Sequence, residues 1–295
     1  MLRAVVVGVD ESTESRAAAQ WAGREATLRE RPLRLVHAWS WSPHLASDVP
    51  AGVFEASAAQ RERARSTLGA AETRVRAAFP ALSVTAEAVE GPASSALIRA
   101  GGQAEVLVLG SRGLGVIGGA VAGSVAQHVA AAATVPVVLV RPGTSTEQPR
   151  TAPEDVVLGL DLADPCDEVI AFGFTAAALR GAPLRVVSAW RDPAFYTLGP
   201  GEVALAEGPQ RAAEWQSFQQ AVLESWRGKF PGVEVSPAVV EGRAARPLLD
   251  AAQGAGLVVV GRRIREAPAL GRHNGPVTHA VMHHAACPVA IVPHA

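Results

Sequence analysis

Two hydrophobic patterns alternate along the chain. Short apolar runs, which suit strands buried on both faces, are followed by longer stretches in which apolar residues recur at helical spacing. In the first half, the predicted strands are 3–9, 33–39, 83–89, 105–110 and 136–140, and the predicted helices are 12–30, 58–79, 93–101 and 123–133. This alternation is typical of an α/β domain with a parallel sheet and right-handed crossovers.

The pattern occurs twice. Val5-Val-Val-Gly-Val-Asp10 returns 151 residues later as Val156-Val-Leu-Gly-Leu-Asp161. Two further segments return at the same spacing, and the final strand returns one residue later still. We therefore predict a tandem duplication with domains at 1–143 and 154–295, joined by a linker at 144–153 that is rich in Pro, Gly, Ser and Thr.

Composition excludes several classes of protein. Of 295 residues, 48% are hydrophobic, which excludes a mainly disordered chain. The net charge of −1 argues against nucleic-acid binding through a general basic surface. Cys166 and Cys287 make no disulfide framework. The first apolar run ends at Asp10, and the most apolar stretch, 120–140, has the pattern of a helix followed by a strand, so we expect a cytoplasmic protein outside the membrane.

A ligand site is predicted at one edge of the first sheet. In a doubly wound five-stranded sheet of order 3-2-1-4-5, ligands bind where the winding reverses, at the carboxyl ends of strands one and four. The loop after strand four, Gly110–Val125, is rich in glycine and leads into a helix near Ser124. Backbone amides in such a loop, together with a helix N-terminus, can hold a polyphosphate without lysine. Lys229 is the chain's lysine, and it lies outside this loop.

Two common nucleotide motifs do not explain the loop. Gly113-Leu-Gly-Val-Ile-Gly118 matches the dinucleotide fingerprint, but the acidic residue expected about 20 residues later is missing. A Walker A loop is excluded because no Gly-Lys-Ser/Thr sequence exists.

The spacing Gly110-x2-Gly113-x9-Gly123-Ser124 resembles the ATP-binding signature of the universal stress protein family. The opening Val-Gly-Val-Asp10-Glu-Ser12, the Val-His37-Ala38 strand end and the Val-Pro136-Val-Val strand resemble that family too. The resemblance covers both copies. It implies an adenine-nucleotide alpha-hydrolase-like fold, with the two copies joined as a pseudo-dimer through the edges of their final strands and a homodimer as a further option.

The resemblance also implies a role for each matching residue. Asp10 would bond the adenosine part of ATP, Gly8 and Ala38 would line the base pocket, and Leu109 would pack beside the base. Ser111 and Arg112 would assist in holding the phosphates. The residues that would hold them directly are Gly110, Gly113, Gly123, Ser124 and Val125. Two structural alternatives stay open, namely that Asp10 is a helix cap before Ser12 and that the glycine loop is empty.

The second copy departs from the signature. Gly261 is retained, but Ile264 replaces the middle glycine and Gly275-Pro276 replaces Gly-Ser. Proline lacks an amide donor, although it suits the first position of a helix. Several basic residues enter the loop instead: Arg262, Arg263, Arg265, Arg272 and His273. Whether this copy binds nucleotide or is a structural or regulatory half stays open.

The expected function is that of an ATP-binding stress sensor or regulator without catalytic residues. Because the loop 110–125 contains no carboxylate, we expect at most slow hydrolysis, with any Mg²⁺ held mainly by phosphate oxygens. The alternatives are a nucleotide-hydrolysing or nucleotidyl-transfer enzyme, whose usual motifs are missing, and a scaffold that has lost its ligand. The histidines His279, His283 and His284 are interpreted as residues on a helix surface instead of metal ligands.

Overall fold

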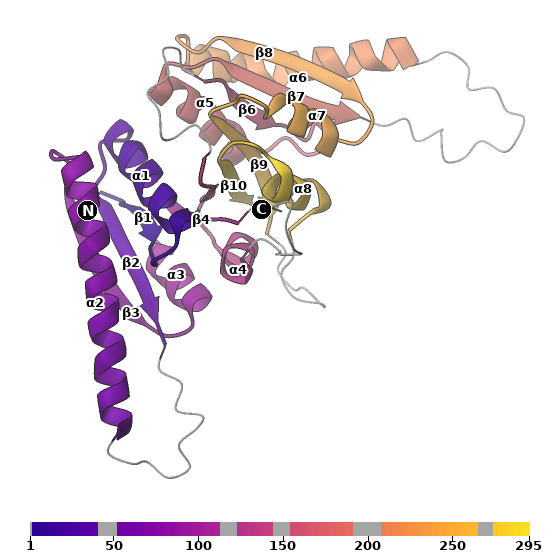
Figure 1. Cartoon of the computed structure of the whole chain (residues 1–295). Coiled ribbons are helices and arrows are strands. Elements are labelled where there is room, and N and C mark those ends of the chain that lie inside the picture. The colour runs from indigo at the N-terminus through magenta and orange to yellow at the C-terminus, as the bar shows by residue number, and fades with distance from the viewer. Residues whose placement is uncertain (1, 41–51, 113–122, 144–153, 191–207, 265–273) are drawn as a thin grey trace, which may run out of the picture. The chain divides into compact units, whose positions relative to one another are not determined.

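Valine-rich segments form the interior of two parallel sheets in the computed structural model of the chain (Figure 1). The structure describes residues 2–40, 52–112, 123–143, 154–190, 208–264 and 274–295. The chain forms two compact units. Unit 1 is built on Met1–Pro149, and unit 2 on Arg150–Ile264 and Gly275–Ala295. The predicted linker 144–153 lies outside the described residues.

Unit 1 has the predicted alternation of strands and helices. Its sheet has the order β3-β2-β1-β4-β5, and the neighbouring strands are parallel. This confirms the doubly wound order 3-2-1-4-5. The elements are β1 (Val5–Gly8), α1 (Thr13–Leu28), β2 (Leu33–Trp39), α2 (Gly52–Ala78), β3 (Val84–Glu90), α3 (Ala93–Gly101), β4 (Val106–Gly110), α4 (Ser124–Ala132) and β5 (Val137–Val140).

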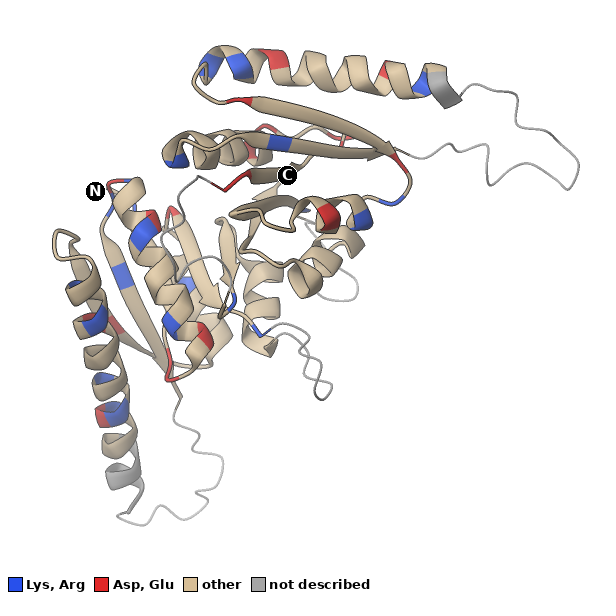
Figure 2. Ribbon diagram, turned by 45° about the horizontal axis from the view of Figure 1, so that its top comes forward, with Lys and Arg blue, Asp and Glu red and all other residues tan. Residues whose placement is uncertain are grey.

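Helices cover both faces of the unit 1 sheet. Helices α1 and α2 contact each other on one face, and α3 and α4 contact each other on the opposite face. The central strands are therefore buried on both sides, and Val5, Val7, Val106 and Val108 have no exposed surface. Charged residues lie mainly on helices and at strand ends (Figure 2).

Helix α1 has a defined start and an unusual end. The hydroxyl oxygen of Ser12 accepts a hydrogen bond from the backbone N–H of Ser15, which makes Ser12 the N-cap. After the last turn, Glu30 takes a left-handed conformation with φ of 53°. A residue with a Cβ adopts this conformation at a cost of about 1–2 kcal/mol.

Unit 2 repeats the architecture. Its sheet has the order β8-β7-β6-β9-β10, again with parallel neighbours. The elements are β6 (Val156–Gly159), α5 (Asp167–Arg180), β7 (Leu184–Trp190), α6 (Gly208–Lys229), β8 (Val235–Glu241), α7 (Ala245–Ala251), β9 (Leu257–Arg263), α8 (Pro276–His284) and β10 (Val289–His294). As expected, Pro276 is the first residue of its helix.

Predicted and observed boundaries differ most at α2. This helix begins at Gly52, although the sequence pattern predicts a start at Ala58. Glycine is a poor helix former, and the residues just after it show no helical hydrophobic period. The local signal therefore does not predict this first part of the helix.

Two further expectations concern the chain as a whole. Association of the two copies through their final strands stays a prediction. In the described part of the chain, no helix has the length and apolar character needed to cross a membrane.

Candidate functional site

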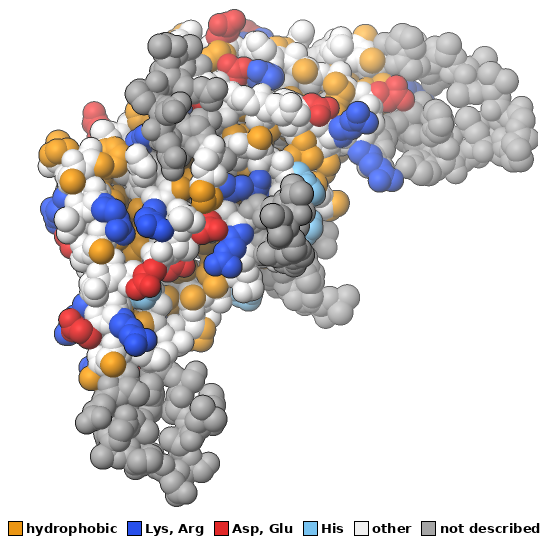
Figure 3. Space-filling model, in the orientation of Figure 1, with side chains coloured by type: hydrophobic (Ala, Val, Ile, Leu, Met, Phe, Trp, Pro, Cys, Tyr) orange, Lys and Arg blue, Asp and Glu red, His pale blue; other side chains and the backbone are white. Residues whose placement is uncertain are grey.

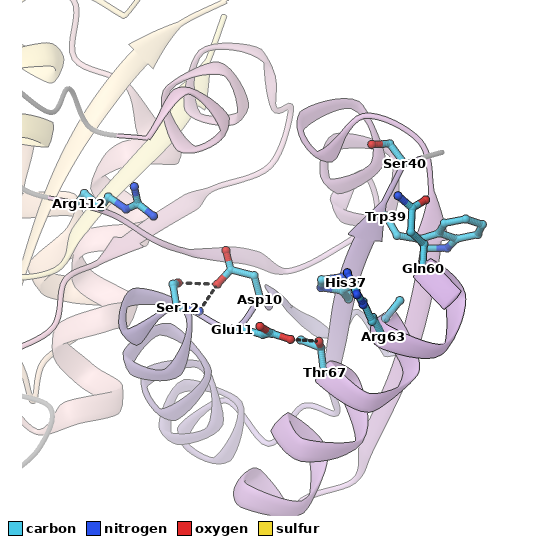
Figure 4. A pocket seen from close by; sticks show the side chains of 11 residues that line it. Asp10, Glu11, Ser12, His37, Trp39, Ser40, Gln60, Arg63, Thr67 and Arg112 are labelled. Atoms are coloured by element: carbon cyan, nitrogen blue, oxygen red, sulfur yellow. Dashed lines mark hydrogen bonds between the residues drawn. The ribbon is translucent and has the colours of Figure 1, made fainter. Parts of the chain in front are cut away.

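A cavity of about 500 Å³ opens at the carboxyl ends of β1 and β2 in unit 1 (Figure 4). One wall is the start of α1, a second is the end of β2, and a third is the first half of α2. The lining residues are Asp10, Glu11, Ser12, His37, Trp39, Ser40, Gln60, Arg63, Ala64, Thr67 and Arg112. This cavity, hereafter the β1–β2 cleft, lies at the predicted carboxyl edge of the sheet. It is centred on β1 and β2, whereas the prediction places the ligand at the ends of β1 and β4, and Arg112 is the lining residue that follows β4.

Asp10 lies two residues after the end of β1 and is exposed in the cleft. Its Oδ1 accepts hydrogen bonds from the backbone N–H and the hydroxyl of Ser12, and its own N–H donates to Ser15 Oγ at 2.8 Å. Asp10 is thus part of the turn that starts α1, but the cap itself is Ser12. Within the described residues, Oδ2 of Asp10 accepts no hydrogen bond, so one carboxylate oxygen can accept from a ligand.

Two hydrogen bonds fix the walls of the cleft. His37 Nδ1 lies 2.7 Å from the carbonyl oxygen of Val9 and donates to it, because a carbonyl can only accept. This bond joins the ends of β2 and β1 and leaves Nε2 of the neutral ring as an acceptor. Across the cleft, Thr67 of α2 donates to Glu11 at 3.2 Å. Figure 4 shows this pair beside Asp10 and His37.

Arg112 and Ser111 follow β4. The Arg112 guanidinium is mostly exposed and lies 3.6 Å from the carboxylate of Glu14 in the first turn of α1. An exposed pair of this kind contributes little to stability, so Arg112 can exchange Glu14 for another anion. The Ser111 N–H donates to Val140. Its buried hydroxyl has no partner within the described residues, which is the type of orphaned polar group that often marks a functional site.

The residues expected around the base lie under the cleft and on the other face of the sheet. A Cβ on Gly8 would lie 2.7 Å from Leu109 and 2.9 Å from Leu97 of α3. Gly8 and Leu109 therefore pack together on the face that carries α3. Ala38 alternates with His37 and Trp39 along β2, so its side chain points to that same face. Of the predicted residues, Asp10 and Arg112 line the cleft.

The residues expected at the phosphates have distinct surroundings. A Cβ on Gly110 would lie 2.5 Å from the backbone of Glu14, so glycine allows β4 to approach the start of α1. Gly123 precedes α4, Ser124 is exposed and Val125 is half-buried, and a Cβ on Gly123 would meet no atom of the described residues within 4 Å. No side chain caps this end of α4, and its first turn holds no acidic residue. Its amides can therefore bind an anion. Gly113 lies outside the described residues.

Sequence reasoning missed most of the α2 wall. Gln60, Arg63 and Thr67 line the cleft, yet they belong to a helix whose pattern shows only an amphipathic surface. Their spacing along one face of α2 is the signal that could have identified them, once the crossover places α2 beside the end of β2.

The comparisons with known proteins agree with this fold. The sequence profile of the "Universal stress protein family" matches residues 1–141 and again residues 154–293. The chain belongs to the universal stress protein family. Curated relatives include "Universal stress protein Rv2005c" and "Universal stress protein Rv2623" of Mycobacterium tuberculosis. The first is 32% identical over 97% of this chain and 96% of its own length. The second is 31% identical over 97% of this chain and 95% of its own length.

The fold of this universal stress protein also matches a solved structure over its whole length. The crystal structure of a universal stress protein from Archaeoglobus fulgidus gives a TM-score of 0.72. It covers 99% of this chain and 98% of its own, at 15% sequence identity. The likeness therefore supports the two-unit fold in a distantly related sequence.

In unit 2 of this universal stress protein, some of the positions that line the cleft of unit 1 carry large apolar residues. At the constant spacing of 151 residues, Leu162 replaces Glu11, and Phe218 replaces Thr67. Ser188 replaces His37 and is buried, with the side chain of Gln219 donating to its hydroxyl at 2.9 Å. Charge is kept at other lining positions, where Asp161, Glu214 and Arg263 correspond to Asp10, Arg63 and Arg112.

The basic segment of unit 2 continues the sheet. Strand β9 extends past Gly261 to Arg263, and Arg262 and Arg263 are in register with Pro293 and His294 of β10. The carboxylate of Asp164 pairs with Arg263. The backbone therefore stays in the strand at the position where unit 1 leaves it to form the glycine-rich loop.

The remaining candidate residues are the histidines of α8 and the two cysteines. The rings of His279 and His283 are in contact at an interplanar angle of 42°, with centroids 4.3 Å apart. His283 is buried, which corrects the expectation that all three histidines lie on the surface. Within the described ranges, no cluster of three or more His, Cys, Asp or Glu residues could hold a metal ion. Within the described residues, Cys166 and Cys287 form no disulfide. Burial raises the pKa of the Cys166 thiol, and so does its hydrogen bond to Glu168, so the thiol stays protonated at neutral pH.

Proposed function

We propose that unit 1 binds an adenine nucleotide, with ATP as the main ligand, and that the protein is a nucleotide-dependent sensor or regulator in the stress response. The observation that carries this proposal is the β1–β2 cleft, in which Asp10 and Arg112 lie at the carboxyl edge of the sheet beside the glycine-rich loop. Membership in the universal stress protein family supports the proposal, because the spacing of Gly110, Gly113, Gly123 and Ser124 resembles that family's ATP-binding signature.

The nucleoside part would be held by Asp10 and its neighbours. The free Oδ2 of Asp10 can accept a hydrogen bond from a ribose hydroxyl or a base amino group. His37 presents a second acceptor, because its Nδ1–H is already engaged by Val9. Gly8, Ala38 and Leu109 lie on the opposite face of the sheet and do not line the cleft, so their contact with the base stays a prediction.

The phosphate part would be held by backbone amides and one arginine. The free amides at the start of α4, from Ser124 and Val125 onward, attract negative charge, and Gly110, Gly113 and Gly123 keep the approach open. The hydroxyls of Ser111 and Ser124 and the guanidinium of Arg112 would add donors. Any Mg²⁺ would be held mainly by the phosphate oxygens.

The proposed role is binding and signalling, with turnover slow at most. Hydrolysis needs a group that positions water and a carboxylate that holds the metal near the phosphates, and the loop 110–125 contains no carboxylate. Glu11 and Glu14, the nearest acidic side chains from α1, are engaged with Thr67 and Arg112.

The direct test is to release and identify the small molecule carried by the purified full chain, and then to titrate ATP, AMP and GTP by calorimetry. We expect a bound adenine nucleotide and saturable ATP binding. Asp10→Ala and Gly123→Ala should both abolish it. In the part of the chain that the structure describes, no atom lies within 4 Å of a Cβ on Gly123, so the second variant should fold normally and report on ligand binding.

Asp161→Ala is the matched control, because Asp161 is the counterpart of Asp10 in unit 2. We expect its ATP affinity to equal that of the wild type. A wild-type protein that carries no nucleotide and shows no ATP affinity at millimolar concentration would refute the proposal. Rapid formation of AMP or pyrophosphate would instead favour a nucleotide-transforming enzyme.

A further inference from the structure

A second cavity lies between the two helices on one face of unit 1. It has a volume of about 250 Å³ and is bounded by the facing sides of α1 and α2, with the end of β1 at its base. Its lining residues recur at three- and four-residue intervals on each helix, as expected for a groove between helices packed side by side. The volume is below that of sites for drug-sized ligands, so an occupant must be small. We name this cavity the α1–α2 groove.

Small side chains and one glycine produce the groove. Ala19 of α1 faces Ala71 and Ala78 of α2 across it. Phe79, the residue after α2, closes one end. Its ring lies directly over Gly23, where a Cβ would come within 2.4 Å. The Phe79 ring therefore packs on α1 at the end of the groove and does not fill the space between the two helices.

Unit 2 shows that this space is not a requirement of the fold. At the same spacing of 151 residues, Ile170 replaces Ala19, Val222 replaces Ala71 and Phe174 replaces Gly23. There, Phe174 packs against Trp226 and Phe230, with ring centroids 6.0 and 5.5 Å apart. The same interhelical region is therefore filled by large side chains in unit 2 and left open in unit 1.

The polar groups of the groove favour an anion. Arg16 and Arg74 both line it, one from each helix. Arg16 uses its Nε to donate to the Ser12 carbonyl, and within the described residues Arg74 forms no ion pair. The acidic residue in the lining is Asp10, whose Oδ1 is already engaged by Ser12. In unit 2, Asp167 and Ser225 replace the two arginines, so the positive charge disappears together with the space.

A buried hydroxyl adds a donor. Ser15 is 5% exposed and lines the groove. Its oxygen accepts the N–H of Asp10, and its own hydrogen has no acceptor within the described residues. A carboxylate would provide that acceptor.

We propose that the α1–α2 groove is a second ligand site, which binds a small monocarboxylate with an apolar body. The carboxylate lies with Arg16 and Arg74, and the apolar body lies against the alanines, Val75 and Phe79. The site is separate from the proposed nucleotide site, because Val9 and Asp10 lie between the groove and the β1–β2 cleft and only Asp10 lines both.

The test is a titration of the full-length protein, without nucleotide, with phenylacetate and with its neutral analogue phenylacetamide, followed by calorimetry and ligand-observed NMR. We expect saturable binding of phenylacetate and binding of the amide that is at least about tenfold weaker, as for the loss of a charge-assisted contact. Arg74→Ser, which introduces the unit 2 residue at an exposed position, should weaken phenylacetate binding by a similar factor. Arg65→Ala, on an exposed part of α2 outside the groove, should leave it unchanged.

Two filling variants test the position of the site. Ala19→Ile and Ala71→Val introduce the unit 2 residues, and both should abolish phenylacetate binding without lowering the melting temperature, because the side chains enter empty space. The proposal is overturned if phenylacetate does not bind, if the amide binds equally well, or if the filling variants bind normally. Displacement of phenylacetate by ATP would also overturn it, since the anion would then occupy the nucleotide site.

Discussion

The two units differ most at the glycine that ends the fourth strand of each sheet. In unit 1, β4 ends at Gly110, and the last ladder contact is the Ser111 N–H to Val140. In unit 2, β9 continues beyond Gly261, and the Ile264 N–H still donates to the carbonyl of His294. A backbone that stays in a sheet uses its amides for the ladder, so fewer remain for an anion. The comparison favours unit 1 as the nucleotide-binding half and unit 2 as a structural or regulatory half.

A second contrast concerns the helices beside each sheet. Unit 1 keeps two cavities next to α2, lined by Thr67, Arg74 and small residues. Unit 2 has Phe218 at the position of Thr67, Ser225 at that of Arg74 and Trp226 at that of Val75. On the face of the molecule drawn in Figure 3, charged side chains of both signs are interspersed with apolar ones. The difference between the units therefore lies in how space is filled within one shared fold.

The largest expected effect concerns the aromatic cluster of unit 2. Phe174→Ala removes a fully buried ring that packs against Trp226 and Phe230, and should lower the free energy of unfolding by about 3–5 kcal/mol. Phe218→Ala, at a position that is 43% exposed, should cost far less. Calorimetry of the full chain measures both. Equal losses would show that the cluster does not provide the packing of unit 2.

The next largest expected effect is the loss of stability when Gly110 or Gly261 is replaced by alanine. Gly110→Ala places a Cβ 2.5 Å from the Glu14 backbone and should destabilise unit 1 by about 3 kcal/mol. In Gly261→Ala the nearest atom is 3.0 Å away, in the His294 side chain, so the cost should be about 1 kcal/mol or less. Urea unfolding monitored by amide exchange distinguishes the units. Similar losses in both variants would contradict the close approach of β4 to α1.

Filling the β1–β2 cleft gives a smaller effect, on ligand affinity. Thr67→Phe introduces the unit 2 residue and should weaken ATP binding by about tenfold, which corresponds to about 1.4 kcal/mol, because the ring occupies the cleft. Thr73→Phe, on the exposed side of α2, is the control and should bind ATP normally. If both variants bind ATP equally well, the cleft is not part of the nucleotide site.

The smallest effect concerns the ends of α1 and α5. Both helices end with the same hydrogen bonds, but the left-handed residue is Glu30 in unit 1 and Gly181 in unit 2. Glu30→Gly should stabilise unit 1 by about 1 kcal/mol, and Gly181→Glu should destabilise unit 2 by a similar amount. Glu30→Ala keeps the Cβ and should bring no gain in the melting temperature. If Glu30→Ala raised the melting temperature as much as Glu30→Gly, the gain would come from removal of the Glu30 charge and not from the left-handed backbone.

Much of the fold follows from local sequence. The strands of unit 1 lie within two residues of their predicted bounds, and β2 and the helix α3 have the predicted bounds, because buried apolar runs and helical spacing differ in period. The site was predicted less well. Asp10 and Arg112 line the cleft, but Gly8 and Leu109 pack under it. The α2 wall, with Arg63 and Thr67, was missed because its residues lie far along the chain from both loops of the motif.

The sequence by itself determined that the chain is a duplicated α/β unit, with a glycine-rich loop in one copy and an arginine-rich segment in the other. These features depend on the period and spacing of residues along the chain, which can be seen in the sequence without a structure. Only the tertiary structure decided that β9 continues where β4 stops, and that the α1–α2 groove stays open above Phe79. Such outcomes depend on which distant side chains compete for the same volume, and that competition arises only when the helices pack on the sheet.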